Sequence, residues 1–376
     1  MTRISRLLRT AMLTLTGLCA SASGAQQGAV PSAPSPLARA PIVAEPVLGR
    51  LRVFDNWAVA CDNRLSCSAV SLNPEGMETP NRMLLLIQRG GGPAGAASLR
   101  VLLADQLRDR VELVIDGKRR ARQKVNGDTI AFGGETALDL VRAMGSSYVF
   151  ELRNRKRQVI GTPSLQGLPA ALRYMDEQQG RIGSQAALAA IGDGPADMAR
   201  PLPPEPALPE TIPMLADGTP PVLTDQEQAA TRRLAQCESG LESSQAPEIH
   251  ALDATHALLL LPCDAGAYNL SAVPLVATGA PGNRQIGFAP FDHLPGFTGD
   301  ASAPPLIMNA RWNPTRGELS SFAKGRGLGD CGTAETYRWD GARFRLTEAR
   351  SMPVCRGAWE WPVLFSLNAQ EATGQP

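Results

Sequence analysis

The sequence has almost no net charge and, after its N-terminus, no long apolar run, and each absence excludes a class of function. Only four of its 37 basic residues are lysines, and the formal net charge is +1 at pH 7. A charge so close to zero is not typical of a nucleic-acid-binding protein, which carries a strongly basic surface. After residue 25, no stretch approaches the ~20 apolar residues that a membrane-spanning helix requires. We therefore expect neither a nucleic-acid partner nor a transmembrane segment in the mature chain.

The motifs of common enzyme classes are also absent. The sequence has no G-x-S-x-G elbow, no Walker A loop and no H-E-x-x-H pair. It has three histidines, so a serine or cysteine nucleophile would have few possible bases. Residues 327–332 match G-x-G-x-x-G, but a dinucleotide site needs a helix after this loop, and here a strand-like segment follows. We interpret the match as a turn and expect no cofactor and no recognisable catalytic residue.

The N-terminus has the pattern of a secretory signal peptide. Arg3, Arg6 and Arg9 precede an apolar run at residues 11–20, and Ser23-Gly24-Ala25 fits the small-x-small cleavage rule. The run is too short to span a bilayer. The alternative is a buried N-terminal helix. We expect residues 1–25 to be removed and the mature protein to reside in a bacterial periplasm.

Cysteine usage agrees with an oxidising compartment. Loss of Cys19 with the signal peptide leaves six cysteines: Cys61, Cys67, Cys237, Cys263, Cys331 and Cys355. An even number in a secreted chain indicates disulfides, and six cysteines allow 15 pairings. Closure of short loops favours Cys61–Cys67, Cys237–Cys263 and Cys331–Cys355. The alternative is a metal site, which would need C-x-x-C pairs or histidines at ligand spacing; the sequence has neither, so we expect no metal.

Composition divides the mature chain into two parts. Residues 26–45 are rich in Ala, Pro, Gln and Ser and predict a disordered N-terminus. Prolines cluster toward the end of residues 192–221, which predicts a stiff, exposed linker. We expect an N-terminal module at residues 46–191 and a C-terminal module at residues 222–370.

Alternating and apolar runs predict a mainly β protein. Turns are expected at Asp116-Gly117 and Asn126-Gly127, because both dipeptides favour hairpin turns. Strands are expected at 57–61, 83–89, 99–104, 111–115, 148–152, 256–262, 268–277, 286–289, 318–324, 336–339 and 343–347. Helices are expected at 135–144, at 169–180 and at 224–237, the last opened by the capping box of Thr224 and Glu227. The expected class is α+β, mainly antiparallel β, with two disulfide-bonded modules joined by a Pro-rich linker.

Three blocks of residues resemble a bacterial periplasmic family known as domain of unknown function 1176. The first block is Trp57, Cys61-Asp62-Asn63 and Cys67. The second is Gly167-Leu168, Ala171-Leu172, Met175-Asp176, Gln179-Gly180-Arg181 and Gly183. The third is Cys331, Trp339-Asp340-Gly341, Phe344, Met352, Cys355-Arg356-Gly357 and Trp361-Pro362. The N-terminal module also distantly resembles invasion-associated locus B proteins. In the first family an aromatic residue often follows the second cysteine, where this chain has residues 68–71, Ser-Ala-Val-Ser. The resemblance implies compartment, length and architecture, and it implies no activity.

Basic residues alternate after the Asp116-Gly117 turn. Lys118, Arg120, Arg122 and Lys124 occupy alternate positions, and Arg153, Arg155 and Arg157 repeat the pattern. Alternate side chains of a strand share one face, so these cations are expected to project together as an anion-binding site. The alternative is a solvated hairpin in an arginine-rich composition. In a periplasm, the anion at hand is the phosphate of phospholipid or lipopolysaccharide.

Carboxylates and tryptophans leave a second function open. A glycosidase needs two facing carboxylates, and sequence does not show which ones face each other. The last third of the chain contains Trp312, Trp339, Trp359 and Trp361, which suit sugar stacking or, as we favour, core packing. We favour a non-enzymatic, envelope-associated binding or structural protein, whose partner is an anionic lipid, lipopolysaccharide or an envelope protein. The alternative is an envelope polysaccharide hydrolase with unidentified carboxylates.

Overall fold

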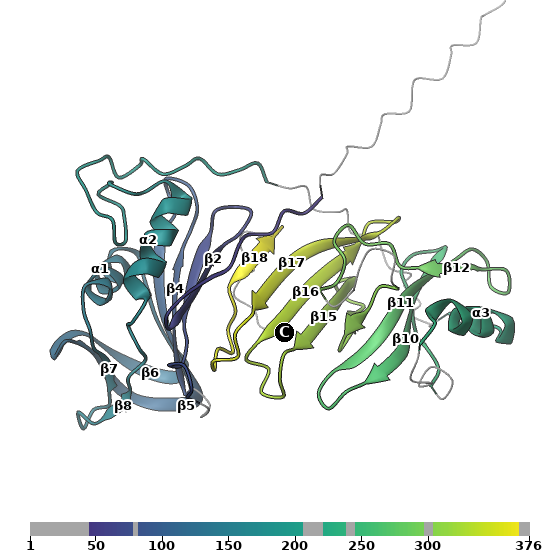
Figure 1. The fold of residues 1–376 in the computed structure, drawn as a ribbon, viewed down its shortest axis with the longest axis horizontal. Helices are drawn as coiled ribbons and strands as arrows, with labels where there is room; N and C mark the ends of the chain where they lie inside the picture. Colours follow the sequence, from purple (N-terminus) through teal and green to yellow (C-terminus); the bar gives the residue numbers. More distant parts are fainter. Residues whose placement is uncertain (1–44, 78–81, 206–220, 238–244, 297–303, 368–376) are drawn as a thin grey trace, which may run out of the picture. The chain divides into compact units, whose positions relative to one another are not determined.

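A computed structural model describes residues 45–77, 82–205, 221–237, 245–296 and 304–367 (Figure 1). The predicted signal peptide, nearly all of the predicted disordered N-terminus and residues 206–220 of the predicted linker lie outside the described residues. No helix in these five ranges is long and apolar enough to cross a membrane.

The described chain is built mainly from antiparallel strands, as the sequence predicts. The first part of the chain contains β1 (Arg52–Phe54), β2 (Trp57–Cys61), β3 (Cys67–Ser71), β4 (Met83–Arg89), β5 (Ala97–Ile115), β6 (Lys118–Gly133), α1 (Gly134–Gly145), β7 (Phe150–Arg153), β8 (Val159–Gly161) and α2 (Leu168–Gln179). The second part contains α3 (Asp225–Ala235), β9 (Glu248–Ala251), β10 (His256–Ala265), β11 (Leu270–Thr278), β12 (Gln285–Phe288), β13 (Ile307–Met308), β14 (Arg311–Asn313), β15 (Glu318–Lys324), β16 (Gly332–Trp339), β17 (Phe344–Met352) and β18 (Val363–Ser366).

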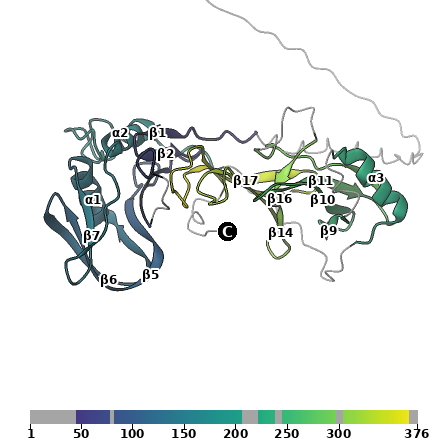
Figure 2. The same cartoon turned by 60° about the horizontal axis from the view of Figure 1, so that its bottom comes forward.

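The first sheet is organised around the long strand β5. The order is β1-β2-β3-β4-β5-β7-β8, and β6 pairs with the other edge of β5 (Figures 1 and 2). Alternate apolar residues of β5, among them Val111, Leu113 and Ile115, point to one face of this sheet. The helices α1 and α2 cover that face with apolar residues at helical spacing, including Val141 and Met175, so one core lies between the sheet and the helices.

One predicted turn is wrong, and two predicted strands are one. Residues 99–104 and 111–115 both belong to β5, which continues through the mostly polar residues 105–110. Asn126-Gly127 does not form a turn, because β6 runs through it and Gly127 pairs with Leu107. The register shifts between the Leu102 and Leu107 pairs, and Gly127 has a φ of 149°, a region that favours glycine. The dipeptide therefore marks a bulge within the ladder.

The second part of the chain contains two further antiparallel sheets. Their orders are β12-β11-β10-β9, with β13 on β11, and β14-β15-β16-β17-β18. A shared core includes Leu258 and Leu260 of the first of these sheets and Tyr337 and Phe344 of the second. On the other face of β10 and β11, a separate cluster lies under α3. The capping box of α3 is present: the Thr224 hydroxyl accepts from the Glu227 amide, and the Glu227 carboxylate accepts from the Thr224 amide.

Three disulfides cross-link the chain, and they are the short-range pairs that locality favours: Cys61–Cys67, Cys237–Cys263 and Cys331–Cys355. Cys331 also belongs to a cluster with Trp361 of the last part of the chain and Ala58 and Leu84 of the first sheet. The guanidinium of Arg356 adds polar contacts, donating to the backbone oxygens of Asp55 and Asn73. Residues from both halves of the chain therefore share one core cluster.

Candidate functional site

Strand pairing gathers basic side chains on one face of the β5–β6 hairpin. Arg108, Arg110 and Glu112 of β5 lie opposite Asn126, Lys124 and Arg122 of β6, and Arg119 lies opposite Val114. On the other edge of β5, Arg153 lies opposite Glu112. Since directly paired residues share a face, six cations lie on the face that points away from the helix-covered core. We call this set the basic face: Arg108, Arg110, Arg119, Arg122, Lys124 and Arg153.

The predicted alternation holds only in part, because β6 contains a bulge. Leu113 pairs with Ala121 and Val114 with Arg119, so Arg120 is an extra residue without a partner. Lys118 consequently pairs with Ile115, on the opposite face from Arg122 and Lys124. The four cations of the predicted set therefore do not all project together.

The second predicted set is also divided. Arg153 lies on the basic face, but Arg155 and Arg157 lie beyond the end of β7. Arg155 is 3.7 Å from Asp109, a residue whose register places it on the core side of β5. Sequence reasoning missed Arg108, Arg110 and Arg119. Alternation in the sequence at 107–115 could have indicated that Arg108 and Arg110 share a face. No pattern in the sequence indicates the bulge that places Arg119 on that face.

One carboxylate lies at the centre of the basic face. Arg122 Nε donates to Glu112 at 3.0 Å, and Arg119 lies 3.3 Å from the same oxygen. The hydrogen bond from Arg122, reinforced by its charge, holds the pKa of Glu112 below its usual value. Arg153 pairs with Glu151 at 2.6 Å. Six cations thus surround two carboxylates, and Arg110 and Lys124 have no acidic partner within the described ranges.

An exposed aromatic residue lies beside the tip of the hairpin. The Asp116 carboxylate accepts from the amides of Tyr148 and Val149 at 3.1 and 2.9 Å, which fixes these residues next to the Asp116-Gly117 turn. The side of the tip is therefore apolar: Tyr148 is 91% exposed and Val149 is 48% exposed. Basic residues next to an exposed aromatic and an aliphatic residue are typical of surfaces that bind at a membrane interface.

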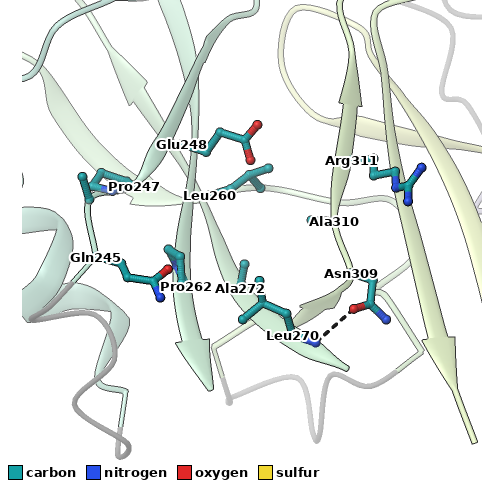
Figure 3. Close-up of a pocket in the computed structure, with 11 residues that line it drawn as sticks. Gln245, Pro247, Glu248, Leu260, Pro262, Leu270, Ala272, Asn309, Ala310 and Arg311 are labelled. Carbon is teal, nitrogen blue, oxygen red and sulfur yellow. Dashed lines mark hydrogen bonds between the residues drawn. The ribbon is translucent and has the colours of Figure 1, made fainter. Parts of the chain in front are cut away.

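A separate open pocket lies at β9, β10 and β11 (Figure 3). Its volume is about 490 Å³, and Leu260, Leu270 and Ala272 form apolar walls. Glu248 and Arg311 lie on its rim, and Asn309 Oδ1 accepts from the Leu270 amide at 3.0 Å. Glu248 is the one carboxylate among the described lining residues, so the pocket lacks the facing pair of carboxylates that glycoside hydrolysis uses.

The four tryptophans in the last third of the chain belong to two different clusters. Trp339 lies in the core that the two C-terminal sheets share, with Trp312 packed against it. Trp361 lies in the cluster that includes residues of the first sheet, with Trp359 at its edge. Trp339 Nε1 also donates to Asp253 at 2.8 Å. This placement accounts for the four tryptophans as packing residues.

Two of the three histidines pack against these tryptophans. Asp253 pairs with His256 Nδ1 at 2.8 Å, and the His256 ring lies against Trp339. His250 lies 3.1 Å from Glu248 and against the ring of Trp312. Across the described ranges, no group of three or more His, Cys, Asp or Glu side chains is arranged to hold a metal ion.

Comparison with known proteins places the chain in a family. A family model described as "Protein of unknown function (DUF1176)" matches residues 51–368. An uncharacterised protein of Escherichia coli (strain K12), YpfG, is 28% identical over 340 residues, which cover 84% of this chain and 92% of that protein. No solved structure matches the chain. Because the family model covers well over half of its length, the chain belongs to the DUF1176 family.

Proposed function

We propose that this protein is exported to the periplasm and docks, without catalysis, on an anionic lipid surface through the basic face and the adjoining hairpin tip. The observation that carries the proposal is that the same hairpin has unpaired cations on one face and an exposed aromatic residue beside its tip. Arg110 and Lys124 lie directly opposite each other on neighbouring strands, where like charges repel. Phosphates of phospholipid or lipopolysaccharide would relieve that repulsion, and Tyr148 would enter the headgroup layer.

The compartment is part of the same proposal. Three disulfides are typical of proteins in oxidising compartments. The signal-peptide pattern at residues 1–25 supplies the route of export. A Pro-rich linker between two modules and the distant resemblance to invasion-associated locus B proteins stay predictions. For the linker, the prediction is confined to residues 206–220, because Arg200 bonds to Gln179 of α2 and Pro203 bonds to Arg64 in the loop between β2 and β3.

The competing explanation for the basic face is protection of a sheet edge. β6 pairs with β5 alone among the described strands, so its outer edge is open to another chain. Exposed cations on an edge strand discourage such pairing. This explanation predicts no affinity for lipid, and it assigns no role to Tyr148.

The test is sedimentation with vesicles of phosphatidylcholine, with and without phosphatidylglycerol. The parent should bind the anionic vesicles, and salt should weaken binding steeply, because the Debye length is about 8 Å at 0.15 M. Replacing Arg110 and Lys124 together by serine removes two cations, each worth about 1 kcal/mol near an anionic surface, so affinity should fall about 30-fold. Tyr148→Ser should weaken binding without changing its salt dependence.

The matched control is the double variant Arg233→Ser with Arg343→Ser, which removes two exposed cations from the C-terminal half. It should bind as the parent does. If the Arg110/Lys124 variant binds as well as the parent at low salt, the basic face is only a solvated hairpin and the proposal is wrong. Retention by native envelope protein but by no lipid would also contradict it.

A further inference from the structure

A second cluster of basic groups is buried at the end of α2, far along the chain from the hairpin tip. Gly180 ends the helix in the left-handed conformation, and Arg181 follows with its side chain completely buried. Arg181 Nε donates to Gln179 Oε1 at 3.1 Å, and Nη2 donates to the backbone oxygen of Gly92. Its Nη1 is enclosed and has no acceptor among the described residues. One of the donors of a buried cation is therefore unpaired.

Arg89, the last residue of β4, brings a second guanidinium to this place. It is 6% exposed, and its enclosed Nε has no acceptor within the described part of the chain. Burial and then the charge of Arg181 lower the pKa of Arg89 to about 10, so the two cations act on each other. The charge of Arg142 also disfavours the charged form of Arg89, whereas Asp176 and Glu135 favour it.

The buried carboxylate nearby already accepts three hydrogen bonds from the backbone. Asp176 Oδ1 accepts from the Leu188 amide at 2.7 Å, and Oδ2 accepts from the amides of Ala189 and Ala190 at 2.8 and 3.0 Å. Its charge raises the pKa of both arginines, but no hydrogen bond between its oxygens and either guanidinium is present among the described residues. The hydroxyl of Ser184, in the turn that follows Arg181, is likewise buried without a partner among the described residues. Donors therefore exceed acceptors in this cluster.

The surrounding backbone fixes the two arginines. The Gln179 amide donates to the backbone oxygens of Leu65, Arg89 and Gly90, which ties the end of α2 to the end of β4. The loop at residues 90–92 is three glycines, and a Cβ at Gly91 would lie 2.2 Å from the Arg64 oxygen. The close approach of this loop to its neighbours therefore requires glycine. The site is held by elements that do not need a ligand to assemble.

We propose that Arg89 and Arg181 bind a small oxyanion, a phosphate or a carboxylate, between them. The planar fork of guanidinium donors matches both anions, and an anion compensates two buried cations near a single carboxylate that is already bonded to three backbone amides. This site is independent of the lipid surface proposed above, because it lies on other elements and uses other residues.

The experiment uses the mature chain in a buffer free of phosphate and carboxylate, at constant ionic strength. Inorganic phosphate is titrated while the melting temperature is recorded, and calorimetric titration measures binding directly; both are repeated with acetate. Beyond the dissociation constant, each tenfold rise in the concentration of the free anion should raise the melting temperature by about 2 °C. A response to phosphate alone or to acetate alone identifies which anion the site takes.

Arg89→Met is the decisive variant, because among the described residues no hydrogen bond from the Arg89 side chain would be lost. It should weaken binding of the responding anion at least tenfold, so the rise in melting temperature should begin at anion concentrations at least tenfold higher than in the parent. Arg89→Lys keeps the charge without the planar fork of donors, so its affinity for the anion should lie between the affinities of Arg89→Met and the parent. Arg343→Met is the matched control and should respond as the parent does. If the parent responds to neither anion, or Arg89→Met responds as strongly as the parent, the proposal is overturned.

Discussion

Replacement of Asp62 by asparagine should make the protein more stable at neutral pH, because the Asp62 carboxyl is buried in the Cys61–Cys67 loop. Burial raises the pKa of Asp62 from its ordinary value of 3.8 to about 6. The folded state therefore holds a proton that the unfolded chain releases, and stability falls as pH rises from about 4 to about 6. The difference between the two pKa values corresponds to about 3 kcal/mol.

Asparagine keeps the contacts while removing the charge. Both amides that bond to the side chain, those of Arg64 and Ser66, donate to the same oxygen, Oδ1, at 2.8 and 2.9 Å. The free-energy advantage of Asp62→Asn over the parent should therefore grow by about 2 kcal/mol between pH 4 and pH 7, because the unfolded chain already releases part of its protons at pH 4. Urea unfolding with the disulfides intact, followed by fluorescence of buried Trp57, measures it at each pH.

The control is Asp197→Asn, which removes one charge from an exposed position. The difference in free energy of unfolding between this variant and the parent should stay nearly constant across the same pH range. If the difference between Asp62→Asn and the parent is also independent of pH, burial does not destabilise the ionised Asp62 carboxyl, and the reasoning fails.

Two further predictions concern the rest of the fold. Asp176→Asn should cost about 3–5 kcal/mol in urea unfolding, because all three amide bonds lose a charged acceptor and the new NH₂ group replaces one of the two oxygens and faces its amide donors; an unchanged midpoint would show that the three bonds contribute little. Limited proteolysis should first cut the chain between residues 206 and 220, where proline prevents regular pairing. The two fragments should then co-elute in native gel filtration, because they share the cluster of Ala58, Leu84 and Trp361; simultaneous degradation of the whole chain would contradict the linker.

Local patterns in the sequence were enough to predict most elements. The apolar run at 83–89 and the large–small alternation at 57–61 match β4 and β2 residue for residue. The capping box at Thr224 places the start of α3, and Gly180 places the end of α2. These signals work because capping, turn chemistry and periodicity act between neighbouring residues.

Features that depend on pairing between distant residues could not be predicted. The bulge at Arg120 follows from how β6 aligns with β5, and it decides that Lys118 and Lys124 face opposite ways. Asn126-Gly127 suits a turn locally, but the ladder on both sides continues through it. Arg89 of β4 and Arg181 after α2 are close enough for their charges to interact, and no local pattern in the sequence reveals this.

Lysine acylation on vesicles, read by mass spectrometry, tests most directly whether the basic face is the docking surface. The chain has four lysines, of which Lys124 lies on the basic face, Lys118 lies at the hairpin tip, and Lys324 lies in the C-terminal half. When the protein is bound to phosphatidylglycerol vesicles, acylation of Lys124 and Lys118 should fall sharply, and acylation of Lys324 should not change. Full reactivity of Lys124 in vesicle-bound protein would contradict the account.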